Sequence, residues 1–109
     1  MTDHFFVDDP RGKTIICTEK FWRTHISKSH SYLINYEGEV KETLRNPSII
    51  CKDSERGDRE VYYSKIPEML RILKVVVEFR SLKVGEVITA YLVDGIKPGE
   101  KQIWTASSH

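Results

Sequence analysis

After Pro47 the hydrophobic pattern of this chain changes from a helical period to an alternation of two residues, which is the period of a β-strand. The alternating segments are residues 48–53, 59–65, 73–79 and 86–94. The connections between them are short and each contains a glycine or a proline, which suits hairpins or near-hairpins. We therefore predict a four-stranded antiparallel meander.

The composition also favours a sheet. The chain has nine Val and eleven Ile against two Ala and six Leu. Branching at Cβ restricts the side-chain rotamers and suits a pleated strand better than a helix. Strand content should therefore be high for a chain of 109 residues.

Two helices are expected before Pro47. Thr18 offers an N-cap and Glu19 a favourable charge in the first turn, so the first helix should begin at Glu19. Its apolar stripe holds Phe21, Trp22, His25 and Ile26. The second helix has Leu33, Tyr36, Val40 and Leu44 at helical spacing and should end at Asn46, because proline disfavours helix at the preceding residue.

These elements predict one α+β domain over residues 1–109, with the two N-terminal helices packed on the four-stranded sheet. Residues 1–12 should form an irregular lead-in and residues 95–109 a tail. Apolar runs are only a few residues long and no basic-then-apolar leader opens the chain, so we expect a cytoplasmic protein with no membrane contact. Cys17 and Cys51 lie too far apart for a compact zinc finger and should be reduced, so no metal or other cofactor is expected.

The alternation also predicts which sheet face is buried. The inner face should carry Leu73, Val75, Val77, Phe79, Ile88, Ala90 and Leu92, packed on Trp22, Ile26, Val40 and Leu44. The opposite, open face should carry Arg59, Tyr63, Lys65, Lys74, Thr89 and Tyr91, with side chains of adjacent strands about 5 Å apart.

Cations and tyrosine rings on one concave surface are typical of RNA binding, because cations hold phosphates and rings stack on unpaired bases. The ordinary alternative is that these charges only solvate the outer face of a sheet. The net charge of +1 predicts no strong long-range attraction to nucleic acid, so any polyanion site must be local.

His25 and His30 allow two interpretations from the residues alone. Each is either a structural histidine that bonds a backbone carbonyl or a group that exchanges protons near neutral pH. Neither has an acidic neighbour in sequence that would orient it as in a hydrolase triad, and their spacing favours the structural role.

A family resemblance adds to this. The stretch IICTEKFWRTHISKSHSYLINYEGEVKETLRNPSII, followed by VYYSK, LKVVVEF and VITAY, resembles phage and polymorphic-toxin nuclease domains of the barnase/EndoU/colicin/RelE-like fold. The resemblance covers residues 13–94 and rests on short motifs in a shared order. One departure is Ser31 after His30, where a proline and a glutamate are usual.

The resemblance implies a small metal-independent endoribonuclease, a toxin or phage-type effector. The resemblance adds His25 and His30 to the residues that strand alternation places on the open face. The candidate catalytic residues are then His25, His30, Tyr63, Lys65 and Thr89, and the candidate substrate-binding residues are Arg59, Lys74 and Tyr91. A toxic ribonuclease needs a neutralising partner, and an acidic antitoxin or immunity protein would fit a basic groove. The alternatives are a catalytically silent RNA-binding domain and a protein-interaction module on the same fold.

Overall fold

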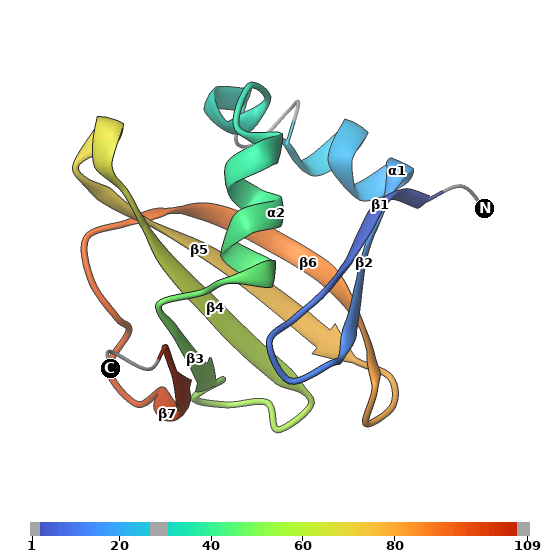
Figure 1. The fold of residues 1–109 in the computed structure, drawn as a ribbon, viewed down its shortest axis with the longest axis vertical. Coiled ribbons are helices and arrows are strands. Elements are labelled where there is room, and N and C mark those ends of the chain that lie inside the picture. The colour runs from blue at the N-terminus through green and yellow to red at the C-terminus, as the bar shows by residue number, and fades with distance from the viewer. Residues whose placement is uncertain (1–2, 27–30, 107–109) are drawn as a thin grey trace.

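Seven strands form one sheet in the order β1-β2-β6-β5-β4-β3-β7 in the computed structural model (Figure 1), which describes residues 3–26 and 31–106. The strands are β1 (Asp3–Asp8), β2 (Thr14–Thr18), β3 (Ile49–Lys52), β4 (Arg59–Ile66), β5 (Arg71–Phe79), β6 (Val84–Val93) and β7 (Lys101–Thr105). Every neighbouring pair is antiparallel except β2 and β6, which run parallel.

The predicted α+β architecture of two helices on a four-stranded antiparallel meander is therefore wrong. β3 to β6 do pair in chain order, but β1, β2 and β7 extend the sheet at both edges and make it mixed. The lead-in predicted as irregular contains β1, whose Phe5 and Val7 are buried while Phe6 is exposed. This alternation covers few residues before turn residues follow, so it does not predict a strand by itself. The strand forms because β2 lies beside it.

The predicted C-terminal loop contains β7, which pairs with β3. Four of its five residues are exposed, so no alternation of buried and exposed residues marks it in the sequence. Its pairing satisfies the backbone groups of β3 that an edge position would leave open to water. Trp104 packs against the main core.

The helices are short. α1 (Glu19–Phe21) begins where predicted, with the Thr18 hydroxyl accepting a hydrogen bond from the Phe21 amide, and it continues as a π-helical turn over Trp22–Ile26. α2 (Glu37–Arg45) begins later than the pattern indicates, because Leu33 belongs to a separate 3-10 turn, Ser31–Leu33. A second 3-10 turn, Pro67–Met69, joins β4 to β5.

The main core lies on the inner face of the sheet, which we define as the face that α2 covers. α2 contacts β1, β4 and β5, so the sheet curls around it (Figure 1). Most of the predicted inner residues are buried there, including Val75, Val77 and Ala90, together with the helix residues Ile26 and Val40. This core fixes the position of every element that carries a candidate site residue.

Ile88 is a wrong prediction. The register between β5 and β6 shifts between Val76 and Val77, so Val77 lies opposite Val87 and Val76 opposite Thr89. Ile88 is the extra residue of this β-bulge and packs on the outer face, while Val87 is buried in the inner core. One inserted residue reverses the side-chain alternation, which a strict period of two does not anticipate.

The outer face is also apolar in its centre. Cys51, Val61, Tyr63 and Val76 form a second buried cluster there, so the central strands are buried on both sides. Cys17 lies in the inner core and Cys51 in the outer cluster, and both are free thiols. None of the helices in the described part of the chain is long and apolar enough to cross a membrane.

Candidate functional site

Three of the predicted site residues form a row across the outer face, and two more adjoin it. Tyr63 on β4, Lys74 on β5 and Tyr91 on β6 are direct cross-strand neighbours. The Lys74 Nζ lies 5.7 Å from the ring centroid of Tyr63 and 5.6 Å from that of Tyr91. Thr89 lies two residues before Tyr91, and His25 adjoins Thr89. We call His25, Thr89, Tyr91, Lys74 and Tyr63 the outer-face row.

His25 reaches the row through its hydrogen bond to Thr89. The His25 Nε2 and the Thr89 Oγ1 are 2.9 Å apart, and the imidazole stacks on Phe21 at a centroid distance of 5.0 Å. The π-helical turn buries Trp22 and Ile26, which leaves His25 between them half-buried. An imidazole that contacts both a hydroxyl and solvent can exchange protons near neutral pH.

The other predicted site residues lie apart from the row. Lys65 is exposed near the end of β4, and Arg59 at the start of β4 pairs with Glu78 at 3.3 Å. Arg59 lies four positions before Tyr63 on β4, which is about 13 Å along the strand. Arg59 therefore does not join the row, and Lys65 adjoins it only beyond Tyr63. His30 lies outside the described residues.

Glu100 belongs to the site although the sequence pattern did not indicate it. Its carboxylate accepts a hydrogen bond from the Tyr63 hydroxyl through Oε1 and pairs with Lys74 Nζ at 3.1 Å through Oε2. Tyr63 is 2% exposed and Lys74 5% exposed, so the concave surface expected to be open is closed at this end. Glu100 precedes a strand with no clear alternation, so only the folded chain shows where it lies.

The contact with Glu100 changes the acidity of its partners. Burial together with the hydrogen bond to the Glu100 carboxylate raises the pKa of Tyr63 to about 12. Burial alone would lower the pKa of Lys74, but the hydrogen bond to Glu100 outweighs it and the pKa lies above its ordinary value. Lys74 is therefore a fixed cation at neutral pH, held beside two tyrosine rings.

A second polar cluster lies on the inner side, at the end of the sheet that α2 leaves uncovered. The Arg11 Nη2 donates to Asp9 at 2.7 Å, to Glu60 at 2.6 Å and to the Tyr62 hydroxyl at 3.0 Å. The Tyr62 hydroxyl in turn donates to Asp9 at 2.8 Å. Lys13 and Lys52 also approach Glu60. We call Asp9, Arg11, Lys13, Lys52, Glu60 and Tyr62 the mouth network.

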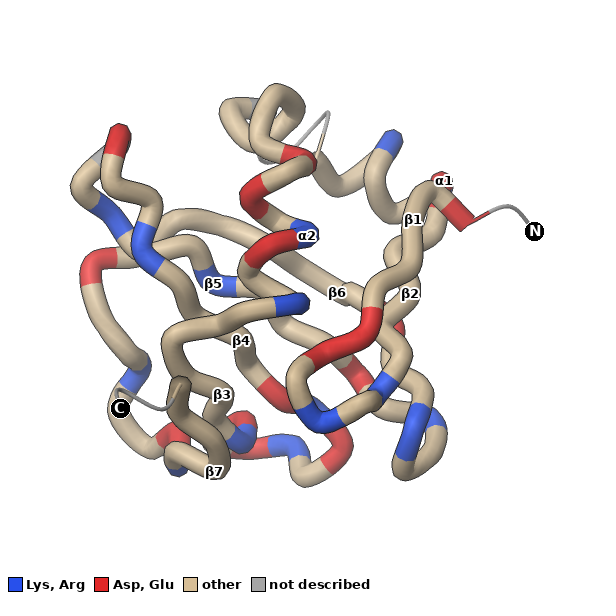
Figure 2. The backbone as a smooth tube through the Cα atoms, in the orientation of Figure 1, with Lys and Arg blue, Asp and Glu red and all other residues tan. Residues whose placement is uncertain are grey.

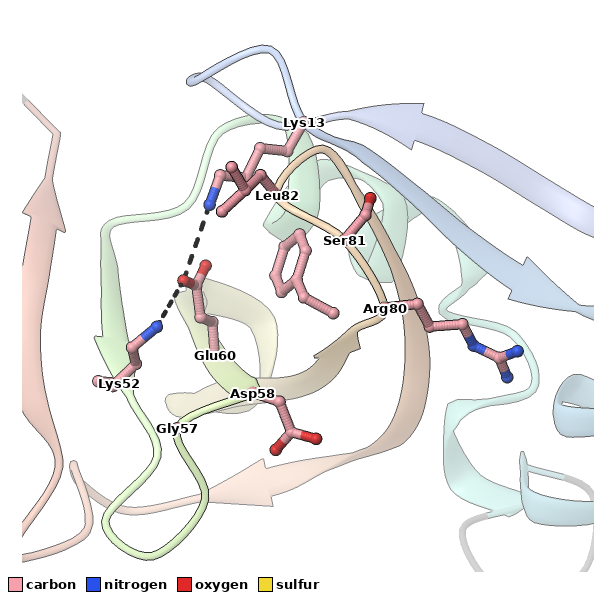
Figure 3. Close-up of a pocket in the computed structure, with 9 residues that line it drawn as sticks. Lys13, Lys52, Gly57, Asp58, Glu60, Arg80, Ser81 and Leu82 are labelled. Carbon is pink, nitrogen blue, oxygen red and sulfur yellow. Dashed lines mark hydrogen bonds and ion pairs between the residues drawn. The ribbon is translucent and has the colours of Figure 1, made fainter.

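The mouth network borders a pocket of about 370 Å³. Figure 3 shows Lys13 and Lys52 pointing toward Glu60 from opposite sides, with Nζ to Oε2 distances of 3.8 and 3.2 Å, while Arg80 points away. Acidic and basic positions meet at the turn between β1 and β2 in Figure 2. Both carboxylate oxygens of Asp9 and both of Glu60 thus accept hydrogen bonds within the network, which is the arrangement of a structural network.

The turn itself depends on this network. One oxygen of Asp9 accepts hydrogen bonds from the backbone amides of Arg11 and Lys13, and Gly12 adopts a φ of 84°, which favours glycine. The same Asp9 side chain binds Arg11 and Tyr62 through its other oxygen. The mouth network therefore fastens the β1–β2 turn to β4.

The outer-face row is the better candidate site, because it contains a half-buried imidazole, a hydroxyl and a fixed cation. Comparisons of the chain with family models, with curated proteins and with solved structures give no match. No group of three or more His, Cys, Asp and Glu side chains within residues 3–26 and 31–106 has the geometry to hold a metal ion. The site's chemistry must therefore be inferred from its own residues.

Proposed function

We propose that this protein is a small metal-independent endoribonuclease, a toxin or phage-type effector that acts in the cytoplasm. The observation that carries the proposal is the hydrogen bond between His25 and Thr89 in the same row as Lys74 and Tyr91. The resemblance of residues 13–94 to toxin nuclease domains supports it. Strand alternation gave Thr89 as a site residue and the resemblance added His25, and the contact between them links a helical turn to a distant strand.

The proposed reaction is attack of a ribose 2′-hydroxyl on the adjacent phosphorus. The 2′-oxygen forms a bond to phosphorus, its proton passes to a base, and the bond from phosphorus to the 5′-oxygen breaks as that oxygen takes a proton from an acid. The products are a 2′,3′-cyclic phosphate and a 5′-hydroxyl. The cation and the proton carriers come from the protein, so the reaction needs no metal ion.

His25 takes the role of the proton carrier, and Thr89 orients its ring. Lys74 stabilises the charge that develops on the phosphoryl oxygens. Tyr63 and Tyr91 donate hydrogen bonds or stack on a base. His30 is assigned the second proton transfer, and Lys65 contacts the RNA backbone beside the row. Arg59, about 20 Å from Lys65, would contact only a more distant phosphate.

The test is to incubate the purified protein with single-stranded RNA in the presence of a chelator and to identify the RNA ends. We expect 2′,3′-cyclic phosphate ends, and we expect His25→Ala and His30→Ala each to lower the rate by about 10² or more. Lys83→Ala is the control and should retain the wild-type rate, because it removes an exposed cation in the turn between β5 and β6, about 20 Å along the strand from Thr89. Cleavage that requires magnesium, or full activity of His25→Ala, would exclude this mechanism.

A neutralising partner belongs to the same proposal. A cell that makes a cytotoxic ribonuclease needs an acidic antitoxin or immunity protein, which would cover the row and the exposed Lys65 beside it. Induced expression should arrest growth, and His25→Ala should relieve the arrest.

The second candidate is a catalytically silent RNA-binding domain. The observation that favours it is the pairing of Lys74 with Glu100, which withholds the cation that the reaction needs, while Lys65 stays exposed to RNA. Such a domain would bind single-stranded RNA and leave its ends unchanged. The remaining alternative, a protein-interaction module, would bind no RNA. Measuring RNA binding and identifying the RNA ends with the same protein preparation distinguishes the three candidate functions.

A further inference from the structure

The side chain of Glu100 is buried in a segment that is otherwise exposed. The structure describes all residues from 94 to 103, and all of them except Glu100 are exposed to solvent. The Glu100 side chain is 1% exposed, and the Lys74 side chain that it contacts is 6% exposed. A carboxylate is costly to bury, so this contact depends on the donors that receive it.

The donors form a compact anion-binding pair. The Lys74 ammonium contacts one oxygen of the carboxylate and the Tyr63 hydroxyl contacts the other. The Tyr91 ring flanks the ammonium from the far side. An ammonium and a hydroxyl that hold two oxygens of one carboxylate can equally hold two oxygens of a phosphate.

The strand that follows Glu100 is anchored independently of this contact. β7 pairs with β3, the Ala106 amide donates to the Ser48 carbonyl at 3.0 Å, and Trp104 packs on the inner core. Before Glu100 the chain passes through Pro98 and Gly99. Glu100 can therefore leave the donor pair by a change of its own side-chain rotamer, while β7 keeps its place.

We infer that Lys74 and Tyr63 form a binding site for a phosphate of single-stranded RNA, and that Glu100 occupies this site as a built-in competitor. The inference rests on the proposed function, since it names a phosphate position of the same site. RNA and Glu100 exclude each other, so the apparent affinity for RNA is reduced by the fraction of molecules in which Glu100 is bound. Removing the Glu100 charge should restore that affinity.

The test measures the binding of a 2′-O-methyl oligonucleotide, which the protein cannot cleave, by fluorescence anisotropy. Glu100→Gln keeps a side chain of the same shape and removes its charge. We expect it to bind about ten-fold more tightly than the wild type at low salt. The logarithm of the binding constant falls linearly with the logarithm of the salt concentration. The magnitude of this slope should increase by about 0.7, which is the value for one further phosphate contact on a single strand.

Glu55→Gln is the matched control. Glu55 is an exposed carboxylate whose side chain lies 4.0 Å from Lys97, so this variant makes the same change in net charge away from the donor pair. The double variant Glu100→Gln/Lys74→Gln should lose the gain in affinity. If Glu100→Gln binds no more tightly than Glu55→Gln, or if its gain persists without Lys74, the inference is overturned.

A second variant covers the case in which Glu100→Gln does not fold. Glu100→Asp keeps the charge but is shorter, so it cannot hold both donors, and its affinity should lie between those of the wild type and Glu100→Gln. A folded Glu100→Asp protein with unchanged affinity contradicts the inference. If the Glu100 variants bind RNA more tightly but neither they nor the wild type cleave it, the ribonuclease proposal is rejected and the phosphate site is kept. If the wild type cleaves RNA but the Glu100 variants bind it no more tightly, the phosphate site is rejected and the ribonuclease proposal is kept.

Discussion

The mouth network and the outer-face row are two clusters of buried charge on opposite faces of one sheet. In the mouth network, Asp9 and Glu60 each receive hydrogen bonds from more than one donor, and the Asp9 side chain is fully buried. In the row, Lys74 is held by a carboxylate from a mostly exposed segment, and His25 remains half-buried. A saturated network keeps its geometry, whereas a single replaceable partner leaves room for a ligand.

The difference has a physical cause. Every charge in the mouth network comes from a strand or from the tight β1–β2 turn, so removing one partner leaves a buried ion that cannot return to water. Glu100 comes from the boundary between a loop and an edge strand, and the residues on both sides of it are exposed, so we expect its side chain to reach water by rotation. The two clusters should therefore respond differently to substitution.

The largest expected effect is on the mouth network. Arg11→Met removes the guanidinium that binds Asp9, Glu60 and Tyr62, and it should lower the free energy of unfolding by about 3 to 5 kcal/mol. Urea denaturation measures this. Arg56→Met is the control, because Arg56 is exposed and pairs with an exposed Asp58, so this variant should unfold at the same urea concentration as the wild type. Equal losses in the two variants would contradict a structural role for the network.

The same network should make the protein sensitive to acid. Burial alone would raise the pKa of Asp9 and Glu60, but the hydrogen bonds from Arg11 and their other donors outweigh it, and both pKa values lie below the ordinary range. The unfolded chain then takes up protons first as the pH falls. Stability should be full above about pH 4 to 4.5 and decline as the pH falls through the native pKa values.

Urea denaturation at several pH values checks this prediction. Arg11→Met should show a shallower decline in acid than the wild type, because its carboxyl pKa values return toward the ordinary range. A decline of equal slope in both proteins would show that other groups cause the acid sensitivity.

In the row, Thr89 should affect chemistry and leave stability almost unchanged. Thr89→Val removes the hydroxyl that holds His25, and we expect a loss of about ten-fold in kcat/KM for RNA, which corresponds to about 1.4 kcal/mol in transition-state stabilisation. The pH profile of cleavage should shift, because the imidazole loses a hydrogen-bond partner. Thr89→Ser, which keeps the hydroxyl, should restore both. A Thr89→Val enzyme with an unchanged rate and pH profile would remove Thr89 from the site.

The smallest effect concerns a third, more exposed cluster. His4 binds Glu19 at 3.0 Å and Glu37 at 2.6 Å and stacks on Trp22, so it ties β1 to both helices. Burial alone would lower the pKa of His4, but the bonds to Glu37 and Glu19 outweigh it and the pKa is raised. Its contribution is therefore full below about pH 6.5 and is lost as the pH rises through the native pKa.

His4→Asn should abolish this dependence and cost less than about 1 kcal/mol at pH 6, because the carboxylates are partly exposed. Thermal melting between pH 5 and pH 9 provides the measurement. A melting temperature that is equally pH-dependent in His4→Asn would assign the effect to another group.

Much of the central sheet was predictable from the sequence. The alternation after Pro47 predicted β3 to β6 and their antiparallel pairing, and the Thr18 cap predicted the start of α1. These features depend on neighbouring residues, and local sequence carries that information. β1 and β7 depend on the strand beside them, and the bulge at Ile88 depends on how β5 and β6 fit together. A single-residue register shift has no sequence signal of its own.

The candidate site divides in the same way. The sequence by itself determined that Tyr63, Lys74, Thr89 and Tyr91 share one face, because side chains on a strand alternate with a fixed period. Only the tertiary structure decided that His25 meets Thr89 and that Glu100 covers Lys74. Both contacts join segments far apart in the chain, and they form because packing the core brings the first helical turn to β6 and the strand after residue 100 to β3.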